Sequence, residues 1–141
     1  NRLFSWYTMR ARLPMDSTPM SKLLIVDDSN IIRNHIARLM LNARLPRIDI
    51  VGLASDGRKA GEMAKAARPD YITMDLTMPH MDGEACIGEM AQLLPDARIL
   101  VVSALSDKAT ALRAISRGAH GFVHKPFSDE TMIQSLLELM S

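Results

Sequence analysis

The sequence predicts an α/β fold in which five parallel strands alternate with five helices, and two observations indicate this class. Short runs rich in Leu, Ile and Val recur along residues 21–141, and each is followed by apolar residues spaced for one face of a helix. The runs are continuous rather than alternating, which is typical of parallel strands with helices on both faces. Right-handed crossovers between successive strands would give a doubly wound sheet.

Three strands are expected in the first part of the chain, and the first two are followed by residues that favour a helix start. Leu23–Val26 is expected to be the first strand, and Ser29 is placed to cap the helix after it. Ile48–Ala54 follows as the second strand, with Asp56 as the candidate cap of the second helix. Tyr71–Asp75 is expected to be the third strand.

The remaining elements follow the same alternation. Asp82 opens a third helix, and Ile99–Ser103 is the fourth strand. Ser106 is expected to cap a fourth helix that ends at Gly118, because glycine favours the left-handed conformation found just after a helix. Phe122–His124 is the last strand, and a fifth helix is expected after it. Ser128 would cap this helix, Asp129 and Glu130 would lie in its first turn, and its apolar face would run from Met132 to Met140.

Length and composition restrict the function classes. A chain of 141 residues forms one domain, and 48% hydrophobic residues are enough for a core. The lone Cys86 cannot form an internal disulfide, which suits a reducing cytoplasm. A net charge of +1 argues against direct binding to nucleic acid, and no apolar run approaches the roughly 18 residues of a membrane span. We expect a cytoplasmic protein that does not insert into membranes.

Residues 1–20 differ from the rest of the chain. They contain the only Trp, Trp6, and two Pro, with no sustained hydrophobic period. We expect an N-terminal arm that is either an upstream extension or one added during cloning, with Met20 as a possible natural start. The alternative is an arm that packs on the domain or on a second copy, because its aromatic residues would otherwise be left in water. A dimer is therefore possible.

Polar side chains stand at the ends of four predicted strands. Asp27 and Asp28 close the first strand, Asp75 the third, Ser103 the fourth and Lys125 the last. The carboxyl ends of parallel strands gather at one crevice, where ligands bind. Taken singly, such residues commonly serve as helix caps or turns. Their coincidence at four strand ends favours a common site.

The residue types in this set indicate metal-assisted phosphoryl chemistry. Clustered carboxylates without His or Cys suit a hard cation, Mg²⁺ first, with Mn²⁺ possible. Asp75 could serve as a nucleophile, because carboxylates form aspartyl-phosphate intermediates. Lys125 and Ser103 could hold phosphoryl oxygens.

Other ligand motifs are missing from the sequence. It contains neither G-x-G-x-x-G after the first strand nor the P-loop pattern G-x-x-x-x-G-K-[ST]. The histidines lack zinc-binding spacing and are expected to be surface or packing residues; they are His35, His80, His120 and His124. Cys86 and the eleven Met are expected to lie mainly in the core.

Four motifs together resemble the receiver domain of two-component response regulators of the chemotaxis type, over residues 21–141. The motifs are Leu24–Ser29, Asp75–Gly83, Val102–Ala104 and Lys125–Phe127. The resemblance implies a flavodoxin-like (βα)5 fold with strand order 2-1-3-4-5. It also implies a Mg²⁺-dependent transfer of a phosphoryl group to Asp75 from a sensor histidine kinase or a phosphotransfer domain.

The resemblance further implies a role for each site residue. Asp28 and Asp75 would bind Mg²⁺ directly, Asp27 would act through water, and the Thr77 carbonyl would complete the protein ligands. Backbone N–H groups near Thr77 and near the residue after the fourth strand would assist in holding the phosphoryl group.

The same resemblance implies a switch. Ser103 would move toward the phosphoryl group held by Lys125, and Phe122 would turn inward. The Lys125–Pro126 peptide would be cis. A downstream target protein would bind the surface formed by the fourth helix, last strand and last helix, residues 106–140.

Two alternative functions stay open from the sequence. A phosphate-independent interaction module would keep the fold without the chemistry. An aspartyl-phosphate phosphatase of the haloacid dehalogenase type would also use Mg²⁺ and a strand-end aspartate. That class has D-x-D at its nucleophile, whereas this chain has Asp75-Leu-Thr77.

Overall fold

The computed structural model describes residues 20–78, 82–105 and 107–141. The expectations for the N-terminal arm and for His80 lie outside the described residues, as does residue 106 itself.

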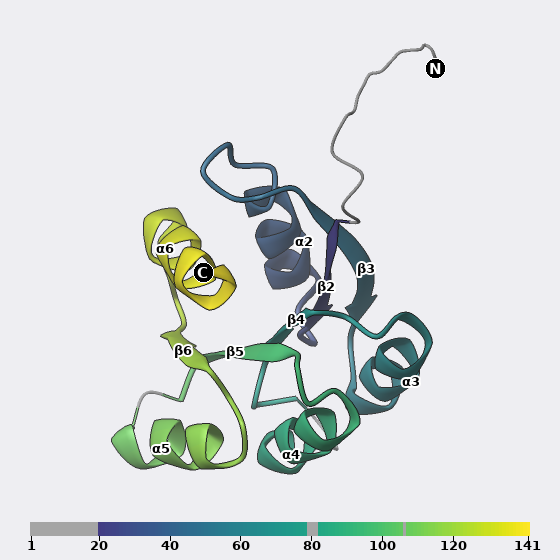
Figure 1. Ribbon diagram of the computed structural model, residues 1–141. Coiled ribbons are helices and arrows are strands. Elements are labelled where there is room, and N and C mark those ends of the chain that lie inside the picture. Colours follow the sequence, from purple (N-terminus) through teal and green to yellow (C-terminus); the bar gives the residue numbers. More distant parts are fainter. Residues whose placement is uncertain (1–19, 79–81, 106) are drawn as a thin grey trace.

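A parallel sheet of five strands forms the centre of the fold, in the order β3-β2-β4-β5-β6 (Figure 1). The strands are β2 (Ser21–Val26), β3 (Ile48–Ala54), β4 (Tyr71–Met74), β5 (Arg98–Ser103) and β6 (Gly121–His124). Counted along the chain, this is the order 2-1-3-4-5, so the predicted doubly wound, flavodoxin-like fold is confirmed. From β2 the chain first builds the sheet to one side, at β3, and then to the other side, from β4 to β6. Folds of this kind bind their ligands at the point where the order of the strands reverses, which here lies between β2 and β4.

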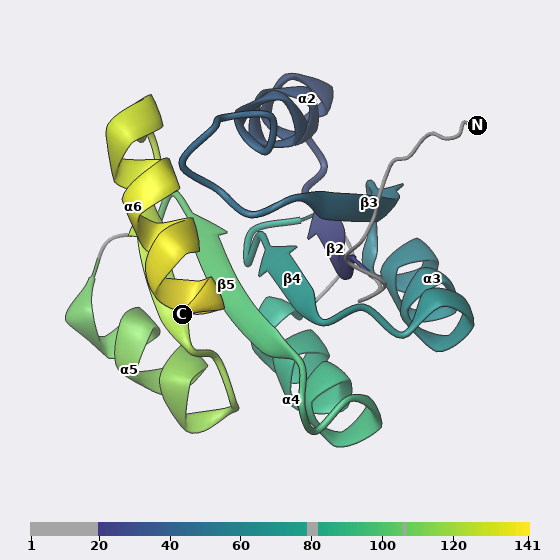
Figure 2. The ribbon, with the colours of Figure 1, turned by 45° about the horizontal axis from the view of Figure 1, so that its top comes forward.

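Helices cover both faces of the sheet (Figures 1 and 2). On one face lie α2 (Asn30–Leu39) and α6 (Asp129–Met140), and on the other lie α3 (Gly57–Ala67), α4 (Gly83–Leu93) and α5 (Lys108–Ser116). Alternate strand residues supply the two cores. Leu23 and Ile25 of β2 pack toward α2 and α6, whereas Leu24 and Val26 pack toward α3 and α4. This division explains the continuous apolar runs.

Three predicted N-caps are formed, and a fourth is shifted. Ser29, Asp56 and Ser128 each accept a hydrogen bond from a backbone N–H of the first turn. The N-cap of α5 is Asp107, one residue after the predicted Ser106, and within the described part of the chain its side chain makes no cap hydrogen bond. Aspartate and serine are about equally favoured as N-cap residues, so the sequence did not discriminate between Ser106 and Asp107.

The predicted C-terminal glycine of α5 is confirmed. Gly118 has a φ of +123°, a conformation that residues with a Cβ rarely adopt. The N–H of Ala119 donates to the carbonyl of Ala114 at 3.0 Å, and the N–H of Gly118 donates to the carbonyl of Ile115 at 3.0 Å. These two bonds form a Schellman motif, which satisfies carbonyls at the helix end.

Cationic side chains from the amino-terminal ends of strands and from one loop bind the carboxyl ends of three helices. Lys22 donates to the Ala67 carbonyl (2.6 Å), Arg68 to that of Leu93 (3.3 Å) and Arg98 to that of Leu139 (2.8 Å). Positive charge at these positions satisfies carbonyls without a helical partner and opposes the negative end of the helix dipole. Within the described ranges, no helix is long and apolar enough to cross a membrane.

Thr73 is the site of a predicted gain in stability. Its side chain lies in β4 between Ile25 and Leu100, is 1% exposed, and has a hydroxyl with no hydrogen-bond partner among the described residues. A buried hydroxyl without a partner loses its hydration without compensation. We expect Thr73→Val to raise the free energy of unfolding by about 1 kcal/mol, measured by urea denaturation.

A buried threonine with a satisfied hydroxyl is the matched control for this substitution. Thr110 is 4% exposed, and its Oγ1 accepts a hydrogen bond from Arg113 Nη2 at 3.3 Å. Thr110→Val is expected to lower stability or leave it unchanged. A loss of stability on replacing Thr73 would contradict the assignment.

Cys86 is predicted to be unreactive in the folded protein. It is buried in α4, and this burial, with a smaller contribution from the charge of Glu89, raises the pKa of the thiol from 9.0 to about 11. The thiolate is the reactive form, so alkylation near pH 8 should be about 100-fold slower than in the unfolded chain. Mass-detected labelling with iodoacetamide in buffer and in urea measures this ratio. Equal rates in the two conditions would contradict the prediction.

Candidate functional site

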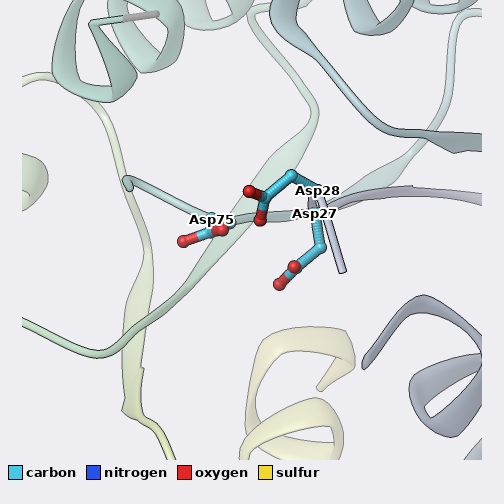
Figure 3. Close-up of side chains that lie close together, drawn as sticks. All are labelled: Asp27, Asp28 and Asp75. Carbon is cyan, nitrogen blue, oxygen red and sulfur yellow. The ribbon is translucent and has the colours of Figure 1, made fainter. Parts of the chain in front are cut away.

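The sheet topology brings three carboxylates together. Asp27 and Asp28 follow β2 directly, and Asp75 follows β4, which is the neighbour of β2 in the sheet. One carboxylate oxygen from each residue lies within 4.8 Å of the other two. Figure 3 shows the three side chains emerging next to one another from these two strand ends.

Burial differs sharply within this acidic cluster. Asp27 and Asp75 are each 1% exposed, whereas Asp28 is exposed to solvent. Burial raises the pKa of Asp27, and the nearby charge of Asp75 raises it further. Hydrogen bonds from Lys125 and from the N–H of Ser29 lower it, but burial outweighs them. The cluster is therefore electrostatically unfavourable without a cation.

Lys125 supplies the positive charge nearest to the buried carboxylates. Its Nζ lies 2.7 Å from Asp27 Oδ2 and 3.5 Å from Asp75 Oδ2, so it sits between the two and bonds to the first. The Lys125 side chain is only 17% exposed. The backbone N–H of Lys125 donates to the backbone carbonyl of Ser103 at 2.8 Å, and the Lys125–Pro126 peptide bond is cis.

Thr77 orients the Asp75 carboxylate. Both the backbone N–H and the hydroxyl of Thr77 donate to Asp75 Oδ1, each at 3.0 Å. The other oxygen, Oδ2, faces Lys125. The two oxygens of this carboxylate therefore lie in different environments, one already bound by two donors and one beside a cation.

Ser103 and Phe122 lie farther from the carboxylates. The Ser103 side chain is fully buried at the end of β5, and its Oγ accepts the N–H of Leu105 at 3.1 Å. Within the described part of the chain, no hydrogen bond joins Ser103 to the acidic cluster. Phe122 is half-buried on β6 and packs against the core beneath α3, α4 and α5.

One contact of the site was missed by sequence reasoning. Arg33, the fourth residue of α2, donates from Nη1 to the backbone carbonyl of Asp27 at 2.6 Å. Its position five residues after Asp28 could have indicated a side chain near the loop. The helix had to be placed on the sheet before the acceptor could be identified.

The donor set fits a hard divalent cation. The cluster offers three carboxylates, and oxygen ligands of this kind suit Mg²⁺ and, less strictly, Mn²⁺. A cation would also relieve the repulsion from Asp75 that adds to the effect of burial in raising the pKa of Asp27. Asp28 is the exposed member of the cluster, so the site is open to solvent at this residue.

Comparison with known proteins identifies the family. The sequence model of the response regulator receiver domain family matches residues 23–137. The chain therefore belongs to this family. It is 36% identical to the chemotaxis protein CheY of Thermotoga maritima over 115 residues, which cover 82% of this chain and 93% of that protein.

Two solved structures of related proteins are relevant to the site. One is the CheX–CheY–BeF3–Mg²⁺ complex from Borrelia burgdorferi, with a TM-score of 0.78, 27% identity, and coverage of 86% of this chain and 90% of that one. The other is a response regulator from Burkholderia pseudomallei with a phosphorylated aspartic acid, calcium ion and citrate. Its TM-score is 0.71, with 28% identity and coverage of 82% of this chain and 66% of that one.

These findings decide against one of the two alternatives left open by the sequence, the phosphatase of the haloacid dehalogenase type. The protein is a receiver with the acidic pocket of Asp27, Asp28 and Asp75, able to hold a metal ion. It is a signalling switch rather than an enzyme of the phosphatase type. Receiver domains pair with histidine kinases in two-component signalling.

Proposed function

We propose that Asp75 accepts a phosphoryl group from the phosphohistidine of a sensor kinase or phosphotransfer domain, in a Mg²⁺-dependent reaction. The observation that carries this proposal is the buried Asp75 carboxylate, held by Thr77 on one oxygen and faced by Lys125 on the other. In the transfer, the phosphorus–nitrogen bond breaks as a bond from phosphorus to the Asp75 carboxylate forms, and the imidazole leaves with the electron pair.

The other residues of the pocket would hold the cation and the phosphoryl group. Asp28 and Asp75 would bind Mg²⁺ directly, Asp27 through water, and Thr77 by its carbonyl. The ion supplies positive charge against both the carboxylates and the incoming phosphoryl oxygens. Lys125, now 2.7 Å from Asp27, would exchange part of this ion pair for a phosphoryl oxygen.

The signal would pass through Ser103. Its hydroxyl now accepts the N–H of Leu105, and a turn of Ser103 toward the phosphoryl group would remove that acceptor. The segment before α5 would then rearrange, and Phe122 would move inward against the core. The surface of α5, β6 and α6 would bind the target protein in one of these two states.

Intact mass spectrometry after incubation with acetyl phosphate tests this function. We expect a single phosphoryl adduct in the presence of Mg²⁺ and none with a chelator. A structural response to Mg²⁺ and beryllofluoride without an adduct would indicate a short-lived phosphoryl bond. Failure to respond to either reagent would contradict the proposal and favour a phosphate-independent interaction module.

A further inference from the structure

The backbone that carries two of the three carboxylates is held at several points. The N–H of Asp27 donates to the Ala54 carbonyl of the neighbouring strand β3 at 3.0 Å. Its side-chain Oδ1 accepts the N–H of Ser29 at 2.9 Å, and its Oδ2 accepts Lys125. The remaining group is the Asp27 carbonyl, which belongs to the peptide unit joining Asp27 to Asp28.

Arg33 binds this carbonyl with one arm of its guanidinium group. Nη1 donates to the Asp27 carbonyl at 2.6 Å, and Nη2 donates to the Asn30 side-chain oxygen at 3.2 Å. Arg33 itself is half-buried. A planar guanidinium held by two acceptors has little rotational freedom, so the orientation of the peptide unit is held as well.

Asp28 depends on that peptide unit more than the other two carboxylates do. Within residues 20–78, 82–105 and 107–141, no hydrogen bond or ion pair restrains its carboxylate. Asp27 is held by Lys125 and Ser29, and Asp75 by Thr77. The backbone fixes the direction of the Asp28 Cα–Cβ bond, so the peptide unit is the constraint on this side chain that the described residues supply.

We propose that Arg33 is a positioning residue for the cation site: it fixes the Asp27–Asp28 peptide and so directs the Asp28 carboxylate toward the ion. This inference rests on the proposed Mg²⁺-dependent function. The bond goes to a neutral carbonyl, and Arg33 forms no ion pair with the cluster among the described residues. Its effect is accordingly one of geometry rather than of neutralised charge.

Calorimetric titration with Mg²⁺ tests the inference without a phosphorylation readout. Arg33→Met keeps much of the aliphatic stem and removes the donors, and we expect its Mg²⁺ dissociation constant to rise about tenfold. Arg33→Lys keeps the charge but lacks the two-armed group, and it should also weaken binding. Arg38→Met, on an exposed position of the same helix, is the control and should bind as the wild type does.

Phosphorylation by acetyl phosphate then separates positioning from general damage. At low Mg²⁺ the Arg33→Met rate should fall by the same factor as the affinity, and saturating Mg²⁺ should restore it to within about twofold of wild type. Far-ultraviolet circular dichroism and the protection of Cys86 establish that the variant is folded.

The possible outcomes distinguish the inference from the function on which it rests. Arg33→Met that binds Mg²⁺ as tightly as wild type, or more tightly through the lost positive charge, would overturn the positioning role alone. A rate deficit that saturating Mg²⁺ does not correct would also overturn it. Wild-type protein that binds no Mg²⁺ would instead refute the proposed function, and the inference with it.

Discussion

Asp75→Asn is expected to abolish the phosphoryl adduct completely while the protein stays folded. The amide keeps an oxygen able to accept the Thr77 N–H but is not a nucleophile toward phosphorus. The substitution also removes the charge that, in addition to burial, raises the pKa of Asp27. We therefore expect the variant to be about 1 kcal/mol more stable than wild type in the presence of a chelator. Intact mass and urea denaturation provide the two measurements.

An exposed aspartate at the edge of the sheet is the control for this variant. Asp49 lies on β3, away from the acidic cluster, and Asp49→Asn should leave both the adduct and the stability unchanged. An adduct that persists in the Asp75→Asn protein would place the acceptor elsewhere, with Asp28 as the next residue to replace.

Lys125→Met is expected to have the largest effect on stability. The lysine is the cation nearest to two buried carboxylates, and its removal leaves the Asp27 charge without its ion-pair partner. Breaking a buried ion pair from one side costs about 3 kcal/mol. We expect a loss of this order at pH 7 in a chelator, measured by urea denaturation. Bound Mg²⁺ should return part of it, about 2.7 kcal/mol at one hundred times the dissociation constant.

The pH dependence of this loss has a definite sign. The pKa of Asp27 in the fold lies above 3.8, mainly because of burial, and it should rise further without Lys125. When the pKa of a carboxyl group is higher in the folded than in the unfolded protein, the free energy of unfolding falls as the pH rises from the unfolded-state pKa through the folded-state pKa. The difference between wild type and Lys125→Met should therefore be smaller at pH 4 than at pH 7.

Lys65→Met provides the matched control, because Lys65 is exposed on α3. It should change stability by less than about 0.5 kcal/mol at either pH. If Lys125→Met were equally mild, the 2.7 Å contact with Asp27 would carry no net energy and the cluster would have to be balanced in another way.

Much of the fold follows from local sequence patterns. Ile48–Ala54 is a strand with the predicted bounds, and Ser29, Asp56 and Ser128 cap helices as expected, because such signals act within a few residues. Where two suitable caps are adjacent, as before α5, the local signal was ambiguous and the prediction was one residue early. Polar residues at the ends of the strands also predicted the site, because the carboxyl ends of parallel strands lie at one edge of the sheet.

Long-range contacts had no local signal. The sequence placed Asp27, Asp28 and Asp75 in one pocket but could not show that two are buried and one is exposed. Nor could it show that Lys125 bonds to Asp27 rather than to Asp75, since both lie at strand ends near it. The preference depends on differences of less than 1 Å, which are set by how the strands and helices pack.

By itself, then, the sequence determined the order of strands and helices, the apolar faces that join them and the chemical types of the site residues. Periodicity, capping and motif spacing carry that information because each depends on neighbouring residues. Only the tertiary structure decided the contact of Arg33 with the Asp27 carbonyl and the lack, among the described residues, of a partner for the Thr73 hydroxyl. A hydrogen bond requires an acceptor within about 3 Å, and for these side chains that is decided by packing between elements.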